Sequence, residues 1–341
     1  MKRSVIVGCA GQDGTILHQF LSGKKHELIG ISRDRITYSA CVAGIDKIDI
    51  ANTDEVYRLV DSLKPHEIYH LAAVHSSSEW KDAPIDNAEL YRSSHSVNVL
   101  SLVNFLEAIR KYSPETRLFY AASSHVFGNE AGDLQDESTP INPNSIYGIT
   151  KAAGLFACGF YRNEYRIFAS TGILYNHESS LRQEQFISKK IIRGAVDVKK
   201  GKKAKLALGD LDAEIDWGYA PDYVVAMYRI LDSSAPGDFI IATGQKHTVR
   251  DFVEVAFGYL GLDWRSYVER DPSIIIKSRI CLVGNPAKLM NVTGWKPSVG
   301  FDQMVRLLVD VELKSGDPQD SYGELCPHRE NSQTEPHVQG N

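Results

Sequence analysis

A glycine turn at the start of the chain, VIVGCAGQDG, restricts the fold more than any other feature of the sequence. Its three glycines follow a short β-rich run, 4–7, and precede a helical pattern, 15–21. The first glycine permits a tight turn, the second lets the backbone approach a diphosphate, and the third allows close packing of helix and strand. The helix N-terminus adds amide donors and a positive dipole end. We therefore predict a dinucleotide-binding turn, with cofactor contacts from Gly8, Gly11, Gln12, Asp13 and Gly14.

Strands and helices alternate along the first half of the chain. The expected strands are 4–7, 27–31, 67–71, 117–121 and 167–173, and the expected helices are 15–21, 54–63, 87–111 and 147–164. This alternation predicts an α/β fold, a Rossmann-type doubly wound parallel sheet with helices on both faces. We assign residues 1–174 to the cofactor-binding domain, to which segments within about 210–250 return. Residues 175–315 are assigned mainly to a smaller, C-terminal substrate-binding domain, and 316–341 to a polar tail that we expect to be disordered.

Composition and charge limit the partners of the chain. Its 341 residues carry a formal net charge of −5 and give a pI of about 6.1, so we expect neither nucleic-acid nor membrane binding. No apolar run approaches the roughly 20 residues of a membrane span. The five cysteines contain no C-x-x-C pair, and no cluster has the spacing of metal ligands. We therefore expect a reduced, cytoplasmic protein without a metal site.

The residues after the second expected strand bear on the choice between NADP and NAD. The segment GISRDRITY places Arg33 and Arg35 on either side of Asp34. An acid at this point binds the ribose hydroxyls of NAD, whereas arginine suits a 2′-phosphate. Two guanidiniums can offset one carboxylate, so we predict NADP, with Arg33 as a ligand; a solvated loop is the alternative. Further cofactor contacts are expected from Asp49 and Ile50 at the adenine edge, and from Leu71, Ala72 and Ala73 after a later strand.

A candidate catalytic set follows the expected strand 117–121. Tyr147 and Lys151 are one helical turn apart and share a helix face. An ammonium beside a phenol lowers the pKa of the phenol, so Tyr147 can act as the base when a sugar hydroxyl loses hydride to a nicotinamide. Lys151 can also hold the nicotinamide ribose, and Ser123 can hydrogen-bond the reacting oxygen. We therefore expect an enzyme; the rival hypothesis, a cofactor-binding regulator, has no use for this set.

Eight stretches of the sequence together carry a family resemblance. They are GCAGQDG, KPHEIYHLAA, SIYGITKAAG, GILYNHESSLR, FISKKI, LGDLDAEIDWGYAPDYVVAM, DFIIATGQKHTVRDFVE and GWKPSVGFDQMV, within about residues 4–313. On these stretches the chain resembles the extended short-chain dehydrogenase/reductases, and among them the GDP-mannose 4,6-dehydratases. The resemblance implies a cytoplasmic, homo-oligomeric enzyme, a dimer or tetramer, that acts on a nucleotide-linked hexose or heptose, with GDP as the expected carrier. It also implies oxidation at C4 with NADP, loss of water across C5 and C6, and return of hydride to C6.

The resemblance also assigns roles by position. Ser123 stands where the family has threonine, and Tyr147 and Lys151 match its catalytic pair. Substrate contacts are implied for Ser124, Asn176, Arg182, Phe186, Lys190 and Arg279. The last of these lies in IIIKSRICLVGNPAK, which lacks the family's R-P-x-E-V pattern.

Other positions depart from the family. His125 replaces the glutamate that takes the C5 proton and assists loss of the C6 hydroxyl, and Ile215 replaces an arginine at the nucleotide. Val74 and His75 replace a polar pair near the sugar.

Three interpretations of His125 stay open. It does the work of the glutamate, because imidazole exchanges protons near neutral pH. Alternatively, elimination is lost, and the enzyme oxidises or reduces C4 or epimerises beside the ketone. In the third interpretation the ring is structural or only donates a hydrogen bond to the substrate. The other histidines near these motifs are expected to be ordinary polar residues: His70, His75, His95 and His177.

Overall fold

The computed structural model describes residues 1–33, 36–38, 47–74, 86–129, 132, 134–274 and 281–315. Several sequence-based expectations lie outside these residues: the tail 316–341, Asp34, Arg35, His75 and Arg279. Within the described ranges, no helix is both long and apolar enough to cross a membrane.

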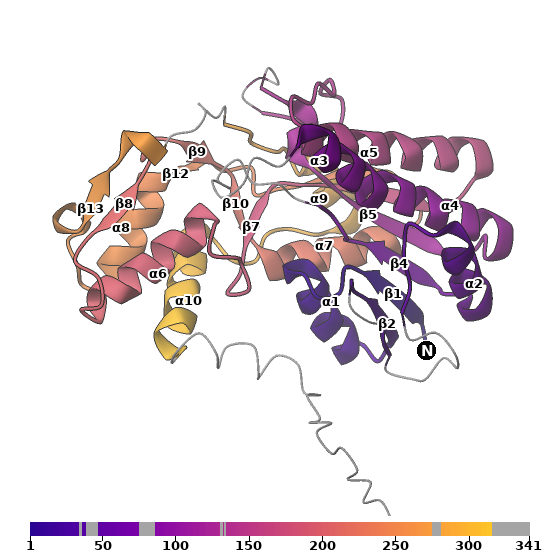
Figure 1. The fold of residues 1–341 in the computed structure, drawn as a ribbon, viewed down its shortest axis with the longest axis horizontal. Coiled ribbons are helices and arrows are strands. Elements are labelled where there is room, and N and C mark those ends of the chain that lie inside the picture. The colour runs from indigo at the N-terminus through magenta and orange to yellow at the C-terminus, as the bar shows by residue number, and fades with distance from the viewer. Residues whose placement is uncertain are drawn as a thin grey trace, which may run out of the picture.

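Seven strands of the described chain form one main sheet (Figure 1). Their order is β11-β6-β5-β4-β1-β2-β3, and all neighbours are parallel except β3, which runs antiparallel to β2 at the edge. The strands are β1 (Arg3–Val7), β2 (Glu27–Ile31), β3 (Ile36–Tyr38), β4 (Glu67–His70), β5 (Arg117–Ser123), β6 (Ala169–Leu174) and β11 (Asp238–Ile241). Every residue of β4 and β6 is buried, as expected for parallel strands covered on both faces. The predicted doubly wound parallel sheet is confirmed.

Helices cover both faces of this sheet. Helices α2 (Thr53–Leu63), α4 (Ser101–Tyr112) and α5 (Ile146–Tyr165) share one apolar core with the strands. Helices α1 (Gln12–Gly23) and α7 (Ala220–Asp232) share a second core on the opposite face. The predicted helix at 54–63 is confirmed and begins one residue earlier. Its start follows Asn52, whose side chain accepts hydrogen bonds from the amides of Asp54 and Glu55.

The helix expected over 87–111 is not uniform. A π-helical segment, Ser96–Leu100, separates α3 (Asn87–His95) from α4. Asn98 in this segment turns inward, where its Oδ1 accepts a 2.9 Å hydrogen bond from the amide of Val74 and its Nδ2 donates to Thr150 at 2.9 Å. Its carbonyl accepts the hydroxyl of Tyr120 at 3.1 Å. The local widening thus ties the end of β4 to α5, and such segments are frequent at functional sites.

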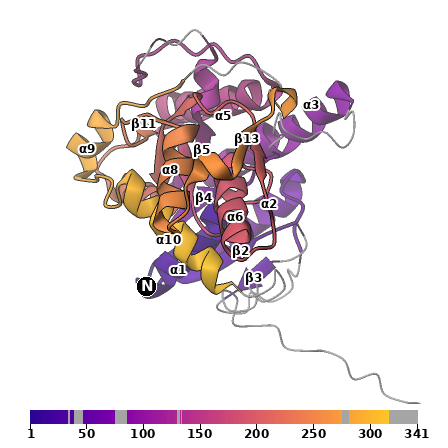
Figure 2. The ribbon, with the colours of Figure 1, turned by 90° about the vertical axis from the view of Figure 1, so that its left-hand side faces the viewer.

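The later part of the chain builds a further apolar core beside the sheet, and the views in Figures 1 and 2 place its helices together. Its helices are α6 (Ile187–Lys199), α8 (Val249–Tyr259) and α10 (Phe301–Lys314). Three small two-stranded sheets accompany them: β7 (Asn176–Glu178) with β10 (Trp217–Tyr219), β9 (Glu214–Ile215) with β12 (His247–Thr248), and β8 (Leu206–Leu208) with β13 (Val268–Arg270). Shorter helices complete the described chain: η2 (Ser124–Phe127), η3 (Trp264–Ser266), η4 (Pro272–Ile274) and α9 (Ala287–Thr293). Between these elements the chain returns to the main sheet through α7 and β11.

Candidate active site

The turn between β1 and α1 has the shape of a phosphate cradle. Gly8 has a φ of +95°, and a Cβ built on it would lie 2.7 Å from the amide nitrogen of Ala72. A Cβ on Gly14 would collide with the carbonyl of Gly8 and the backbone of Cys9. Gly11 caps α1 without a side-chain hydrogen bond, so no capping side chain occupies the first amides of the helix. These features fit the diphosphate of a dinucleotide, which binds backbone amides at a helix N-terminus.

The segment after β4 lies against this turn. The amide of Leu71 donates to the carbonyl of Val7 at 2.8 Å, and the backbone of Ala72 packs on Gly8. Ala73 is exposed, and Val74 is held by Asn98. Asn98 was not singled out from the sequence, because only the π segment turns its side chain toward this edge.

The residues expected at the adenosine end are more exposed. Arg33 lies on the surface two residues beyond β2, and the carbonyl of Ile31 accepts the amides of Gly8 and Cys9. Asp49 is exposed and accepts the amide of Ala51 at 2.9 Å, while Ile50 packs on the core.

The four candidate catalytic residues lie at the end of β5 and the start of α5. Ser123 is 8% exposed, and its hydroxyl is hydrogen-bonded to the phenol of Tyr147. His125 is exposed on η2, and its ring meets the ring of Tyr147 edge to face, with centroids 5.7 Å apart. Lys151 is 1% exposed, and its Nζ lies 5.7 Å from the centre of the Tyr147 ring. The neighbouring Ser124 is buried.

The close approach of η2 and α5 depends on a glycine. A Cβ on Gly148 would lie 2.5 Å from the carbonyl oxygen of His125 and 3.1 Å from Pro143. The first turn of α5 therefore comes close enough to η2 for the rings of His125 and Tyr147 to touch. Ser145 caps this helix by accepting the amide of Gly148 at 3.1 Å.

Burial dominates the protonation of the Tyr–Lys pair. It raises the pKa of Tyr147 to about 12, although the hydrogen bond with Ser123 and the charge of Arg182 act in the opposite direction. Burial also lowers the pKa of Lys151 to about 7, opposed by the carboxylate of Asp13. We expected Lys151 to lower the pKa of Tyr147, but burial raises that pKa instead, and the Lys151 amine donates to the carbonyl of Ala121 at 2.6 Å.

Of the predicted substrate residues after β6, Arg182 and Phe186 contact each other. Arg182 stacks on the Phe186 ring at 3.7 Å, and its Nε lies 3.2 Å from Glu178 Oε2. The charge of Arg182 acts to lower the pKa of Tyr147. Lys190 is half-buried near the start of α6, whereas Asn176 is exposed at the start of β7.

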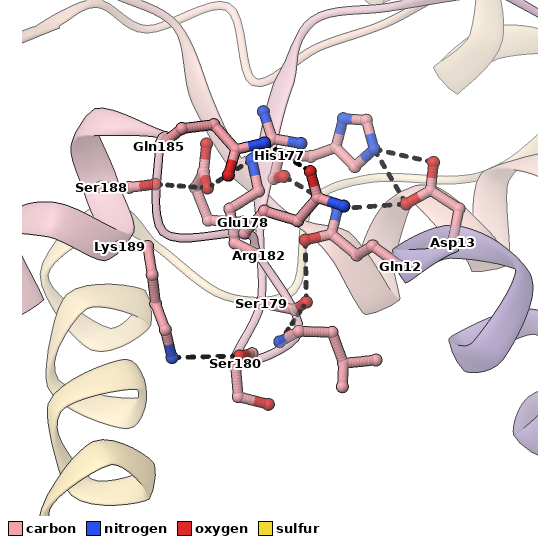
Figure 3. A network of polar contacts seen from close by, with 12 residues as sticks. Gln12, Asp13, His177, Glu178, Ser179, Ser180, Arg182, Gln185, Ser188 and Lys189 are labelled. Atoms are coloured by element: carbon pink, nitrogen blue, oxygen red, sulfur yellow. Dashed lines mark hydrogen bonds and ion pairs between the residues drawn. The ribbon is translucent and has the colours of Figure 1, made fainter. Parts of the chain in front are cut away.

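A polar network joins this segment to the glycine turn (Figure 3). His177 Nε2 lies 3.0 Å from both carboxylate oxygens of Asp13. Gln12 donates to the carbonyl of His177 at 3.2 Å and accepts the hydroxyl of Ser179 at 2.9 Å. We expected His177 to be an ordinary polar residue, and the structure instead gives it a partly buried ion pair. In the sequence, the polar clusters QDG and NHES, which contain Asp13 and His177, were the signal that could have indicated this contact.

The departure from the family at Ile215 places an apolar side chain among apolar neighbours. Ile215 lies in β9, where it pairs with His247 of β12 and packs on the later apolar core. Its side chain therefore supplies no charge to a nucleotide.

Comparison with known proteins agrees with this geometry. Residues 5–308 match the family model described as GDP-mannose 4,6 dehydratase. GDP-mannose 4,6 dehydratase 2 of Arabidopsis thaliana is 35% identical over 333 residues, which cover 92% of this chain and 87% of that protein. Human GDP-mannose 4,6 dehydratase is 31% identical over 355 residues, with 92% and 93% covered.

Solved structures share the fold. The RMD protein of Pseudomonas aeruginosa, complexed with NADPH, superposes with a TM-score of 0.77 at 21% identity, covering 92% of this chain and all of that one. The dTDP-glucose 4,6-dehydratase of Bacillus anthracis, in complex with NAD, gives 0.74 at 20% identity, with 91% and 96% covered. From the family match and the sequence relatives, this chain belongs to the GDP-mannose 4,6-dehydratase family.

Proposed function

We propose that this chain is a cytoplasmic, NADP-dependent enzyme that removes water from a GDP-linked hexose, giving a 4-keto-6-deoxy sugar. One observation carries the proposal: the phenol of Tyr147 meets the hydroxyl of Ser123 and the ring of His125 at one point. Lys151 lies one helical turn behind, and the glycine turn lies at the same end of the sheet. This arrangement offers a base, a hydrogen-bond donor to the oxygen and a second acid–base group.

Tyr147 and its neighbours act first, at C4. Tyr147 removes the proton of the C4 hydroxyl, while Ser123 donates a hydrogen bond to the same oxygen. The protonated form of Lys151, whose Nζ lies 5.7 Å from the centre of the Tyr147 ring, would favour the phenolate that this step requires. NADP, held by the glycine turn, would supply the hydride acceptor for C4 and the hydride donor for C6, and the proton that Tyr147 took from the C4 hydroxyl would be returned to C5.

His125 acts next, at C5 and C6. The new ketone acidifies the C5 proton, and a neutral imidazole takes that proton. The imidazolium then protonates the C6 hydroxyl, so the C6–O bond breaks and water leaves. A histidine suits both roles because its ordinary pKa lies near neutrality. The exposed position of His125, edge to face with Tyr147, supports a place beside the sugar rather than in the core.

The choice of NADP and of GDP rests on different observations. Arg33 is exposed after β2, where a 2′-phosphate would lie in this fold. The RMD structure with NADPH is consistent with that choice. GDP is favoured by the names of the relatives and by Arg182 stacked on Phe186, which offers a charged and aromatic surface.

Isotope labelling tests the proposal directly. GDP-mannose deuterated at C4 is incubated with the enzyme and NADP in ordinary water. Dehydration by this route places the deuterium on the C6 methyl group, and NMR detects it there. Deuterium recovered on free NADPH would instead mean that C4 oxidation ends the reaction.

A second candidate is a nucleotide-sugar C4 dehydrogenase, reductase or epimerase that performs no dehydration. The observation in its favour is His125 itself, since the family has glutamate there. In heavy water, an epimerase that acts beside the ketone would give an isomer containing solvent deuterium without loss of water. A dehydrogenase would give a ketone and accumulated NADPH.

We also propose that the enzyme is a homo-oligomer with α5 at the contact. Large apolar side chains are exposed along this helix at Ile149, Phe156, Phe160 and Tyr165. Such a stripe on the surface of a packed domain is typical of an interface. A second copy of the chain presents the same stripe, so a two-fold contact would cover both.

A further inference from the structure

An ion pair connects the cofactor turn to the segment that carries the candidate substrate residues. Asp13 belongs to the first turn of α1, and His177 belongs to β7. Their contact spans 164 residues of sequence, with His177 Nε2 at 3.0 Å from each oxygen of Asp13. Gln12 reinforces it by bonding both the carbonyl of His177 and the hydroxyl of Ser179 (Figure 3).

The geometry makes this histidine a cation. Its Nδ1 lies 2.7 Å from the carbonyl oxygen of Tyr175, and its Nε2 faces the carboxylate of Asp13. Both partners can only accept hydrogen bonds when Asp13 is ionised, so both ring nitrogens must donate. The ring also stacks on Tyr223, with centroids 4.6 Å apart, and an aromatic face favours a cation. The charged pair is consistent with a pKa of His177 that Asp13 raises against burial and against the charge of Arg182.

The positive charge of His177 faces the negative charge of Asp13 at the cofactor turn. A carboxylate at the N-terminus of α1 would repel the diphosphate that the glycine turn is shaped to receive. The imidazolium of His177, 3.0 Å from both oxygens, neutralises that carboxylate. The segment that carries Arg182 and Phe186 follows β7 directly. The contact between His177 and Asp13 therefore also helps to fix the position of that segment.

We propose that His177 is a positioning residue of the cofactor site that also couples dinucleotide binding to the placement of residues 176–190. The coupling part of this proposal concerns a second ligand, which residues 176–190 would bind. It rests on the proposed function, in which that ligand is a GDP-linked sugar. The cofactor part depends only on the glycine turn.

NADPH binding, followed by fluorescence titration, tests the cofactor part. The variant His177→Gln should bind NADPH about tenfold or more weakly than the parent chain, since it leaves the charge of Asp13 without a counter-charge. Adding Asp13→Asn should restore affinity to within about threefold, because asparagine keeps the hydrogen-bonding oxygen of Asp13 at the cofactor turn and removes only its charge. His18→Gln makes the same chemical change on an exposed position of α1 and should leave binding unchanged.

Two results would overturn the cofactor part: unchanged NADPH affinity in His177→Gln, or a double variant that binds no better than the single one. Circular dichroism checks that each variant is folded. Should His177→Gln fail to fold, the double variant carries the test, because it leaves no unpaired buried charge. NADPH affinity near that of the parent chain then supports the proposal, and lost affinity overturns it.

The coupling is tested by repeating the NADPH titrations with saturating GDP. In the parent chain GDP should tighten NADPH binding about fivefold or more, and in His177→Gln this factor should fall toward one. An equal factor in both proteins, or no effect of GDP in the parent chain, overturns the coupling. Calorimetry with GDP alone separates the two proposals: if GDP does not bind at all, the proposed carrier fails, and the NADPH titrations decide the role of His177.

Discussion

Replacing Lys151 with methionine is expected to stabilise the folded chain at neutral pH, although Lys151 is a candidate catalytic residue. Burial lowers the pKa of this lysine from the ordinary 10.5 to about 7. At pH 7 this lysine is almost fully protonated in the unfolded chain and half protonated in the folded chain. Each tenfold change in the proton-binding constant corresponds to ~1.4 kcal/mol, so burial of this lysine costs the folded state about 4 kcal/mol. Methionine removes this cost and also the 2.6 Å hydrogen bond to Ala121, worth about 1 kcal/mol. The expected net gain is about 3 kcal/mol at pH 7.

The pH dependence provides the sharper test of the same reasoning. Between pH 7 and 10.5 the unfolded chain binds more protons at this lysine than the folded chain does, so the parent protein gains stability as pH rises. At pH 9 the cost has fallen to about 2 kcal/mol, so the advantage of Lys151→Met should shrink by about 2 kcal/mol.

Urea unfolding at the two pH values measures this difference. Lys200→Met is the matched control, because Lys200 is an exposed lysine whose amine also donates to a backbone carbonyl. Equal pH dependence in Lys151→Met and the parent chain, or lower stability of the variant at both pH values, would refute the reasoning.

The remaining predictions concern the reaction and the assembly. Tyr147→Phe should lower kcat by ~10²–10⁴-fold while NADPH still binds, because only the acid–base group is lost; full turnover would remove Tyr147 from the proposed role. His125→Ala should slow dehydration more than C4 oxidation, and His125→Glu should restore part of it; an unchanged rate in His125→Ala means that the ring has no acid–base role. Phe156→Glu with Phe160→Glu should shift the oligomer to monomer in sedimentation experiments, and an unchanged mass would place the interface elsewhere.

The sheet and the cofactor turn could be predicted because their determinants are local. The glycines act within seven residues of sequence, and the strand 27–31 coincides with β2 because its apolar run is bounded by polar residues. The helix 147–164 was likewise clear from its period, and α5 extends it by one residue at each end.

Other features depend on contacts between distant residues. Nothing in the segment around Asn98 indicates a π segment, which accompanies hydrogen bonds to Val74 and Thr150 across the fold. The charge of His177 depends on Asp13, and the two meet only after the chain has folded. Strands of two or three residues, such as β9 and β12, are too short to show an alternating pattern.

The protonation of the catalytic pair was the least accessible property. The spacing of Tyr147 and Lys151 predicts a shared helix face, and both lie on α5 as expected. It does not reveal that the Lys151 amine donates to the Ala121 carbonyl, nor that Lys151 is 1% exposed while Tyr147 is half-buried. Desolvation therefore reverses the pKa direction that proximity alone suggested.

The mass of the product tests the central claim most directly. The enzyme is incubated with GDP-mannose and NADP, and the sugar nucleotide is analysed by mass spectrometry while absorbance follows NADPH. The account predicts a product lighter by one water, with no net accumulation of NADPH. A product lighter by two hydrogens with NADPH accumulating, or an isomer of unchanged mass, would contradict the claim that His125 sustains dehydration.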